Sequence, residues 1–203
     1  MARRTMVMVG GVLLVLGGLV GCAKAPQQSI DQAQAALDQA QKAQAPDYAP
    51  EAWDEAQQSM NAAMAEVEAQ NAKFAPLRSY KNAGQLIETA RDEAAKAEQA
   101  AVSGKERAKA EAESAVTAVK GSLDQANQLL DQLGRCRRRP KGFASDLRLL
   151  RGNVDGLAQQ LGDVESAVSS EGYLEARTLA VELKTQVDSV VNDLERAKAK
   201  IGC

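Results

Sequence analysis

The chain has 203 residues, of which 26% are charged and 3% aromatic, with 25 basic and 27 acidic side chains and no histidine. The lack of histidine removes the commonest general base and a principal zinc ligand, and no glycine-rich phosphate loop is present. A net charge this close to zero does not favour nucleic acid as a partner. We therefore expect a protein that is not an enzyme and that takes no cofactor, metal ion or small-molecule substrate.

The N-terminus has the order of a secretory signal: Arg3 and Arg4, then an apolar run over 6–20, then small residues. This run is shorter than the roughly 20 residues that a membrane span needs. Its end, Leu19-Val20-Gly21-Cys22, resembles the lipobox of bacterial lipoproteins. The resemblance implies cleavage before Cys22 and acylation of its thiol and of the new amine. Two or more acyl chains hold a protein firmly at a membrane.

Residues 1–21 are therefore set aside as a cleaved signal peptide, and 22–28 as the acylated cysteine with a short tether. Without Arg3 and Arg4, 23 basic and 27 acidic side chains remain, which gives a net charge of −4. A fully extended tether of this length reaches about 20 Å. The folded part should therefore stay close to the membrane surface.

From Ser29 onward, apolar side chains recur at alternating intervals of three and four, which is typical of a helical seam. The pattern predicts an all-α protein: an elongated antiparallel helical bundle or coiled-coil hairpins with heptad seams. We divide it into an alanine-rich helical region (29–133), a basic loop (134–143) and a C-terminal helical hairpin (144–203). In chain order, the seams run from Ile30 to Ala40, Trp53 to Phe74 with Gln70 as a polar exception, Tyr80 to Ala101, Ala112 to Leu133, Leu147 to Val168, and Tyr173 to Ile201.

Aromatic residues are expected to mark the starts of helices, and a cage that binds a ligand is the alternative. Their wide separation along the chain favours the first interpretation. Tyr48-Ala49-Pro50 and Phe74-Ala75-Pro76 share one pattern, in which proline takes the first helical position and the aromatic folds back on the first turn. Phe143 and Tyr173 stand at the starts of the last two segments. Tyr48 would pack in this way onto Trp53.

Ser103-Gly104 leaves two alternatives for residues 76–133. The segment is either one helix of about 58 residues, near 87 Å long, or two helices that turn at Gly104. Glycine inside a helix costs about 1 kcal/mol, and no proline follows. We favour the continuous helix.

Cys136 and Cys203 remain if Cys22 is acylated. Outside the inner membrane the environment is oxidising, and the last helix should return antiparallel to the one before it, which brings Cys203 near Cys136. We predict an intrachain disulfide, with an intermolecular bond or two free thiols as the alternatives.

Five basic residues surround Cys136: Arg135, Arg137, Arg138, Arg139 and Lys141. They either contact anions, such as lipid phosphates or peptidoglycan carboxylates, or simply complement the dipole of the preceding helix as solvated charges. Acidic residues elsewhere alternate with Lys and Gln on helical faces, and no carboxylate pair stands out as catalytic.

The segment from Ile30 to Ala101 resembles a family of alanine-rich helical bacterial lipoproteins of unknown function. The resemblance rests on Leu37-x-x-Ala40, on Tyr48-Ala49-Pro50 with Trp53 and Ala56, and on repeated Ala-x-x-x-Ala spacing. It implies a helical envelope protein without an assigned activity. The chain is also similar to the murein-lipoprotein type as an acylated coiled coil, but Ile201-Gly202-Cys203 follows Lys200 where that type ends in its crosslinking lysine.

These observations predict a membrane-anchored lipoprotein with a structural, scaffolding or protein-interaction role, which contacts a protein partner or a second copy through its seams. Ala23 is not the aspartate that retains lipoproteins in the inner membrane of well-known sorting systems, so the analogy favours the periplasmic face of the outer membrane. The alternative is an accessory binding lipoprotein of a secretion or transport complex. That alternative predicts an exposed apolar stripe or a groove on an otherwise closed bundle.

Overall fold

Helices make up nearly all of residues 24–203, which are the residues that the computed structural model describes. The all-α prediction is confirmed. The signal peptide, the lipobox residues Leu19, Val20 and Gly21, and Cys22 lie outside the described residues. The elements in chain order are α1 (Gln27–Lys42), α2 (Ala45–Tyr48), α3 (Pro50–Asn71), the 3-10 turn η1 (Ala75–Leu77), α4 (Lys81–Gly134), α5 (Phe143–Ser169) and α6 (Tyr173–Ile201).

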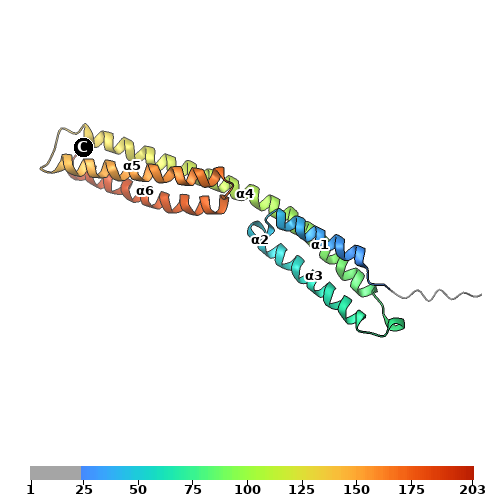
Figure 1. Cartoon of the computed structure of the whole chain (residues 1–203). Coiled ribbons are helices and arrows are strands. Elements are labelled where there is room, and N and C mark those ends of the chain that lie inside the picture. The colour runs from blue at the N-terminus through green and yellow to red at the C-terminus, as the bar shows by residue number, and fades with distance from the viewer. Residues whose placement is uncertain (1–23) are drawn as a thin grey trace, which may run out of the picture.

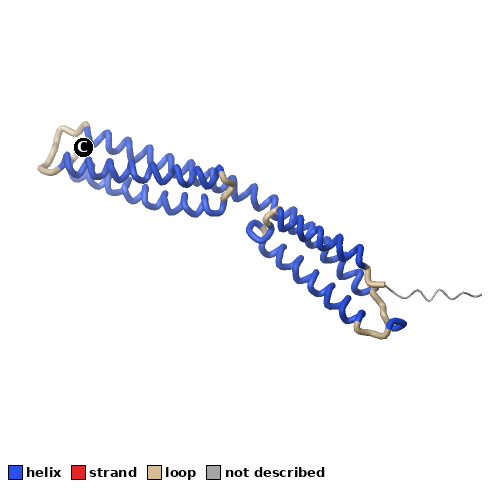
Figure 2. The backbone as a smooth tube through the Cα atoms, viewed as in Figure 1, coloured by secondary structure: helices blue, strands red, loops and turns tan. Residues whose placement is uncertain are grey.

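Two three-helix bundles share the long helix α4 and follow one another along it (Figure 1). In the N-terminal bundle, α1 and α3 pack on the first half of α4, and α2 makes the turn between them. In the C-terminal bundle, α5 and α6 pack on the second half of α4. In the described part of the chain, the loops lie at the two ends of the rod and where the two bundles adjoin, and long helices fill the lengths between them (Figure 2). The described chain begins at one end of this rod, and the C-terminus lies at the other.

The continuous form of α4 agrees with the favoured alternative, since the helix runs through Gly104 without a break and has 54 residues. Such a helix is about 81 Å long at 1.5 Å per residue. Gly104 is buried, and a Cβ placed on it would lie 2.3 Å from the backbone oxygen of Tyr48. Glycine at this position therefore lets the end of α2 approach α4 more closely than any other residue would allow.

The core of the N-terminal bundle consists mainly of alanine. Ten of its 15 buried residues are alanines. Of the larger buried residues, α1 and α3 contribute two each and α4 contributes one. Small side chains allow helix axes to approach closely, but each contributes little apolar area. The buried residues are Ile30, Ala33, Leu37, Ala40, Ala45, Ala56, Met60, Ala63, Val67, Ala83, Ile87, Ala90, Ala94, Ala97 and Ala101.

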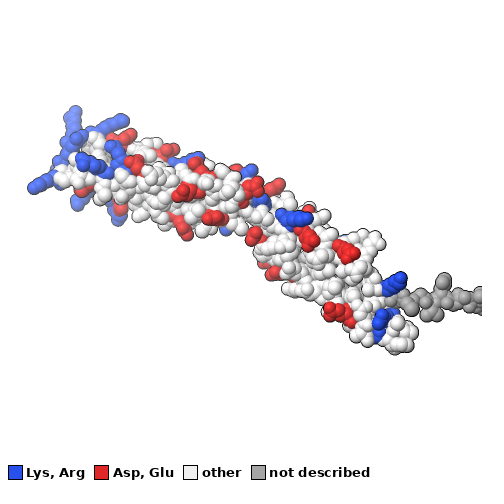
Figure 3. All heavy atoms as spheres, in the orientation of Figure 1, with Lys and Arg blue, Asp and Glu red and all other residues white. Residues whose placement is uncertain are grey.

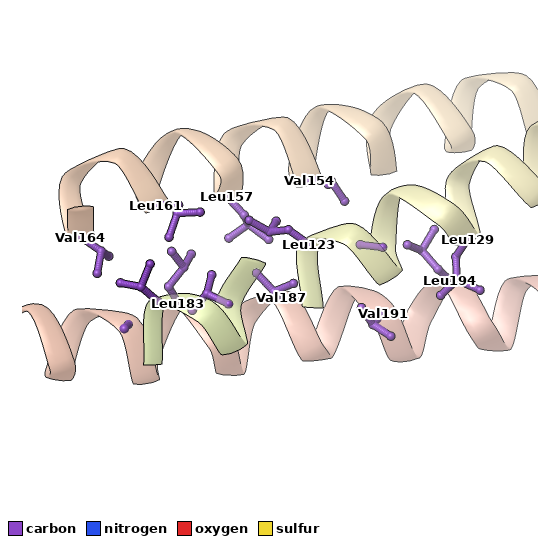
Figure 4. Packing of buried hydrophobic residues seen from close by; sticks show 14 of the residues in the cluster. Leu123, Leu129, Val154, Leu157, Leu161, Val164, Leu183, Val187, Val191 and Leu194 are labelled. Atoms are coloured by element: carbon purple, nitrogen blue, oxygen red, sulfur yellow. The ribbon is translucent and has the colours of Figure 1, made fainter. Parts of the chain in front are cut away.

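The core of the C-terminal bundle consists mainly of leucine and valine, with five alanines among its 22 buried residues. Leucines and valines from α4, α5 and α6 converge between the three helices (Figure 4). Leu130, Leu133, Leu194, Val119, Val154 and Val187 are among its fully buried side chains. With larger side chains at the seam, this bundle buries more apolar surface for each helical turn than the N-terminal one.

The seam residues read from the sequence are buried almost throughout, including the polar exception. Gln70 is 6% exposed, and its side-chain oxygen accepts hydrogen bonds from the Lys73 ammonium (3.1 Å) and the Ser79 backbone N–H (3.1 Å). Its amide nitrogen donates to Glu66 (2.7 Å). Gln70 therefore occupies a seam position because it ties the end of α3 to the loop that follows.

Two expectations differ from the structure. Phe74-Ala75-Pro76 does not start a helix as predicted: Pro76 lies in η1, α4 begins at Lys81, and Phe74 is 75% exposed. The packing units also differ from the sequence division, because α4 contributes to both cores and the change of core falls between Ala101 and Ala108. Residues 29–133 therefore contain the whole N-terminal bundle and one of the three helices of the C-terminal bundle, the second half of α4.

Candidate functional site

The rod end that carries the C-terminus contains most of the sequence-predicted site residues, and we call it the tip. It comprises residues 134–151 and 196–203. The α4–α5 loop, the first turns of α5 and the last turn of α6 meet there (Figure 1). The predicted disulfide and the predicted basic cluster both lie in this region.

Cys136 and Cys203 form a disulfide in the structure, with a Cα–Cα distance of 5.8 Å, inside the range usual for such bonds. Polar contacts between the parallel helices α4 and α6 explain why the two residues meet. Residues 66 apart pair along the bundle, as in Glu111–Arg177 (2.5 Å) and Gln132–Lys198 (2.6 Å). The cysteines are 67 apart and continue this register at its end.

Gly202 completes the approach of Cys203 to Cys136. Its φ of +69° is the left-handed conformation that ends helices and that glycine adopts without steric cost. The chain leaves the axis of α6 at this point, and Cys203 N–H donates back to the Lys198 carbonyl at 3.2 Å. The end of α6 is thereby turned across the end of α4.

The tip is strongly cationic, whereas the rest of the molecule is acidic. The tip carries ten basic and one acidic side chain, a net of +9, while the remaining described residues carry 13 basic and 26 acidic, a net of −13. Basic side chains cluster at this end in the space-filling view, and acidic ones are spread along the rest of the rod, which we call the shaft (Figure 3). The mild overall charge conceals this separation.

The five basic residues of the sequence-predicted cluster do not share one role. Arg139 donates hydrogen bonds to the backbone oxygens of Cys136 (3.2 Å) and Gly134 (2.8 Å), which are among the last carbonyls of α4 and the loop. Arg139 therefore interacts with the C-terminal end of α4, as the helix-dipole alternative predicts. The other four are exposed and make no ion pair within residues 24–203: Arg135, Arg137, Arg138 and Lys141.

A pocket of about 750 Å³ opens at the tip between the start of α5 and the ends of α4 and α6. Its walls are apolar, and its rim carries cations and one carboxylate, Asp146. This volume lies within the range of small-molecule and cofactor sites. The apolar lining residues are Leu133, Pro140, Phe143, Leu147, Leu150, Ala197 and Ile201, and the cationic ones are Arg138, Arg139, Lys141 and Lys200.

The pocket exists because α5 covers the core incompletely in its first two turns. Leu147 and Leu150 are half-buried and Leu149 is 67% exposed, whereas Val154 further along α5 is fully buried. Leu133 and Ile201 therefore form the floor of an open pocket rather than the closed end of a core. Sequence reasoning missed Lys200 and the apolar lining residues, although the antiparallel return used to place Cys203 brings Lys200 to the same end.

The two bundles meet at a junction built around Tyr48, which packs against both cores. Its hydroxyl donates to the Glu171 carbonyl at 3.4 Å, and the Lys105 ammonium pairs with the Glu171 carboxylate at 2.7 Å. The hydrogen bond to Lys105 lowers the pKa of Glu171, and the same bond raises the pKa of Lys105. Tyr48 therefore joins the two bundles, whereas the sequence predicts only a local contact with Trp53.

A further polar contact joins α4 and α6 in the middle of the C-terminal bundle. The Asp188 carboxylate accepts hydrogen bonds from Lys184 (2.5 Å) and Ser122 (2.7 Å). The bond from Lys184, and then that from Ser122, lower the pKa of this carboxyl group. Each carboxylate oxygen thus accepts one hydrogen bond, and the bond from Ser122 links α4 to α6.

Comparison with known proteins identifies no relative: family models, curated proteins and solved structures give no match to this chain. Within residues 24–203, no cluster of His, Cys, Asp or Glu side chains has the arrangement of a metal site. None of the helices in this range combines the length and apolar character of a membrane span. The tip is the candidate site, because exposed cationic side chains gather there beside an open pocket and are suited to binding an anion.

Proposed function

We propose that this chain is an acylated helical lipoprotein of the bacterial envelope that acts as a scaffold or spacer. Cys22 holds one end of the rod at a membrane, and the tip at the other end binds an anionic component of the envelope. The observation that carries this proposal is that the two ends of the rod differ. The described chain begins at one end, and its most cationic surface lies at the other (Figures 1 and 3).

The length of α4 sets the reach of such a spacer. A continuous helix of about 81 Å connects the two bundles, and no flexible linker interrupts it. Residues 24–26, which precede α1, are too few to add more than about 10 Å. The tip would therefore be presented at a distance from the anchor that the fold itself determines.

The helical seams argue against obligate assembly through helix faces. Both seams are covered within one copy of the chain, and the exposed large apolar residues along the shaft, such as Val102 and Val181, are scattered. Single exposed apolar residues are normal on soluble surfaces. The partner contact that the sequence assigned to the seams is therefore assigned to the tip.

The chemistry of the tip favours an anionic ligand that also carries apolar groups. Arg138, Lys141 and Lys200 would face the negative charge at the rim, and Phe143 and Leu147 would contact the apolar part inside the pocket. Anionic phospholipid has both properties, whereas a peptidoglycan carboxylate would use the rim alone. By the sorting analogy of Ala23, we propose the periplasmic face of the outer membrane as the location.

An accessory role in a secretion or transport complex is the second candidate, and the tip pocket is the observation that favours it. It is an open pocket with an apolar lining at the end of a bundle, and a groove on a bundle is the feature that this alternative predicts. A protein partner with an acidic, apolar-tipped segment would fit the same residues. Crosslinking from Leu149 in the native envelope distinguishes the two, because it yields either a protein adduct or a lipid adduct.

The anchor is tested by Cys22→Ser. This variant should leave the membrane fraction and appear in the aqueous fraction after a high-salt wash, because it lacks the acylated thiol. Cys203→Ser serves as the control and should remain membrane-bound. Retention of the Cys22→Ser variant on washed membranes would contradict the anchor.

The tip is tested by reversing the charge of Arg135, Arg137, Arg138 and Lys141 to glutamate, with Arg139 left in place because it supports the backbone. Acylated protein in neutral vesicles should capture a second population of anionic vesicles, and the variant should lose this capture. The control reverses four exposed cations of the shaft, Lys42, Lys96, Arg107 and Lys109, for the same change in net charge. Equal loss in both variants would contradict a tip-specific site. If the protein bound purified peptidoglycan and did not bind vesicles, the ligand would be this polymer and not lipid.

A further inference from the structure

The α3–α4 loop, residues 72–80, exposes two large apolar side chains close together in the chain. Phe74 is 75% exposed and Leu77 is 72% exposed, the highest values among the large apolar residues of the described chain. The other exposed residues of this kind lie singly on separate turns of α4, α5 and α6. Two such side chains within four residues are not explained by the packing of the N-terminal bundle.

The loop holds a defined conformation while it exposes them. The Arg78 guanidinium donates to the backbone oxygens of Asn71 and Lys73, both at 2.9 Å, and Leu77 N–H donates to the Phe74 carbonyl at 2.8 Å. The Tyr80 hydroxyl donates to the Asn71 side-chain oxygen at 2.5 Å. Together with buried Gln70, these bonds fix the loop with Phe74 and Leu77 directed away from the core.

The loop lies at the end of the rod where the described chain begins, close to the start of α1 (Figure 1). The tether to Cys22 therefore leaves from the same end as the exposed pair. No acidic residue occurs between Glu68 and Glu88, while three basic residues occur in that interval: Lys73, Arg78 and Lys81. Lys24, at the start of the described chain, is exposed at this end as well.

We propose that the α3–α4 loop is a second membrane contact, which inserts Phe74 and Leu77 into the interface of the anchoring bilayer and places Lys24, Lys73 and Lys81 against anionic phospholipid head groups. An aromatic and an aliphatic side chain flanked by lysines match the chemistry of the membrane interface. The inference rests on the proposed acyl anchor, which brings this end to a bilayer. The loop alone provides few apolar groups, so its role is to orient the rod rather than to hold it.

The functional consequence is control over the tilt of the rod. Attachment through the tether alone would let an elongated molecule lie along the membrane. A tether and an inserted loop at the same end restrict that motion, because two attachments define an orientation. The tip is then held away from the anchoring membrane, where an anionic partner elsewhere in the envelope can reach it.

The test uses the full acylated chain in vesicles of phosphatidylcholine and phosphatidylglycerol, with a tryptophan as the probe. Trp53 is the single tryptophan, so Trp53→Phe combined with Phe74→Trp reports on the loop. We expect a blue-shifted emission and loss of intensity when the lipids carry bromine in their acyl chains. Val181→Trp in the same Trp53→Phe background places the probe on the shaft, where neither change should occur.

Four outcomes would overturn the inference in whole or in part, and each has a different meaning. If the protein floats with the vesicles but the probe in the loop shows no quenching, the loop does not enter the bilayer and the anchor stands. If the emission of the loop probe is blue-shifted without bromine quenching, a protein surface covers the loop, a second copy of the chain included. If the protein does not float at all, the anchor fails and the loop contact fails with it. Quenching that is as strong without phosphatidylglycerol would remove the role assigned to the lysines.

Discussion

The two bundles of this rod have the same helical arrangement but reach it with different side chains. Alanine makes up ten of the 15 buried residues in the N-terminal bundle and five of 22 in the C-terminal bundle. A buried alanine removes little apolar area from water, so close approach of the helices must compensate through many small contacts. The C-terminal bundle buries larger groups and is closed by a disulfide. We infer that it is the more stable half.

The difference also separates their tasks. The N-terminal bundle is the half next to the proposed anchor, while the C-terminal bundle carries the cationic tip and its open pocket. An open pocket leaves apolar groups exposed to water, which the remaining core must offset. The leucine-rich core and the Cys136–Cys203 bond lie in the same bundle as the pocket, where their stabilisation offsets this exposure.

Removing the disulfide should produce a large effect that is confined to one bundle. The double variant Cys136→Ser with Cys203→Ser opens a loop of 67 residues, which should lower the free energy of unfolding of the C-terminal bundle by about 4 kcal/mol on the loop-entropy estimate. Hydrogen exchange should accelerate in α6 and stay unchanged in α1. Equal acceleration in both helices would show that the bundles unfold as one unit, and no acceleration would contradict the bond.

The two cores should be destabilised by opposite changes of side-chain size. Leu194 and Ala94 are both fully buried. Leu194→Ala should cost about 2–5 kcal/mol because it leaves a cavity. Ala94→Leu should cost about 1–3 kcal/mol because the closely spaced helices cannot accommodate three more carbons. Thermal unfolding followed by circular dichroism measures both, and a stable Ala94→Leu variant would contradict the close packing of the N-terminal bundle.

Glycines of α4 provide a matched test of the junction. Gly104→Ala forces the new Cβ against the Tyr48 carbonyl and should destabilise by about 1–3 kcal/mol. Gly121→Ala meets nothing within 4 Å and should stabilise by about 0.5–1 kcal/mol through helix propensity. Chemical denaturation of the two variants compares them directly. Stabilisation of both would mean that α2 does not press on α4.

The Glu171–Lys105 pair should give a small pH dependence at the junction. The pKa of Glu171 lies below its ordinary value of 4.5 in the folded protein because of Lys105. Its contribution is therefore present above pH 4.5 and is lost as the pH falls through the lower, folded value. Glu171→Gln should flatten this part of the stability profile, whereas Glu165→Gln, within the C-terminal bundle, should leave the junction unchanged. A profile that Glu171→Gln leaves unaltered would exclude the pair as a contributor.

The seams, the helical class and the meeting of Cys136 with Cys203 could be predicted from the sequence because each depends on periodicity and on the antiparallel return of one helix. The bundle boundary could not, since the spacing of apolar residues continues through α4 while its partners change. Phe74 was expected to start a helix because it repeats the Tyr48 pattern, yet Gln70 and Arg78 organise the following residues into a loop. The pocket depends on how far α5 stands from α6, which no local pattern encodes.

The separation of charge could be predicted from the sequence, but the small net charge of the whole chain hides it. Arg148, Arg151, Lys198 and Lys200 join the predicted cluster only when α5 and α6 are placed at the same end. Counting charges by the end of the rod, rather than by segment, gives the cationic tip. Hydrogen bonds assign Arg139 to the backbone, and its basic neighbours are the residues that we propose for the ligand.

Every role proposed for the rod depends on the acylation of Cys22, which mass spectrometry of the N-terminal peptide from the membrane-extracted protein can detect. We expect a chain that begins at Cys22 and carries diacylglycerol on the sulfur and an acyl group on the amine. A chain that still begins at Met1, or an unmodified Cys22, would contradict it.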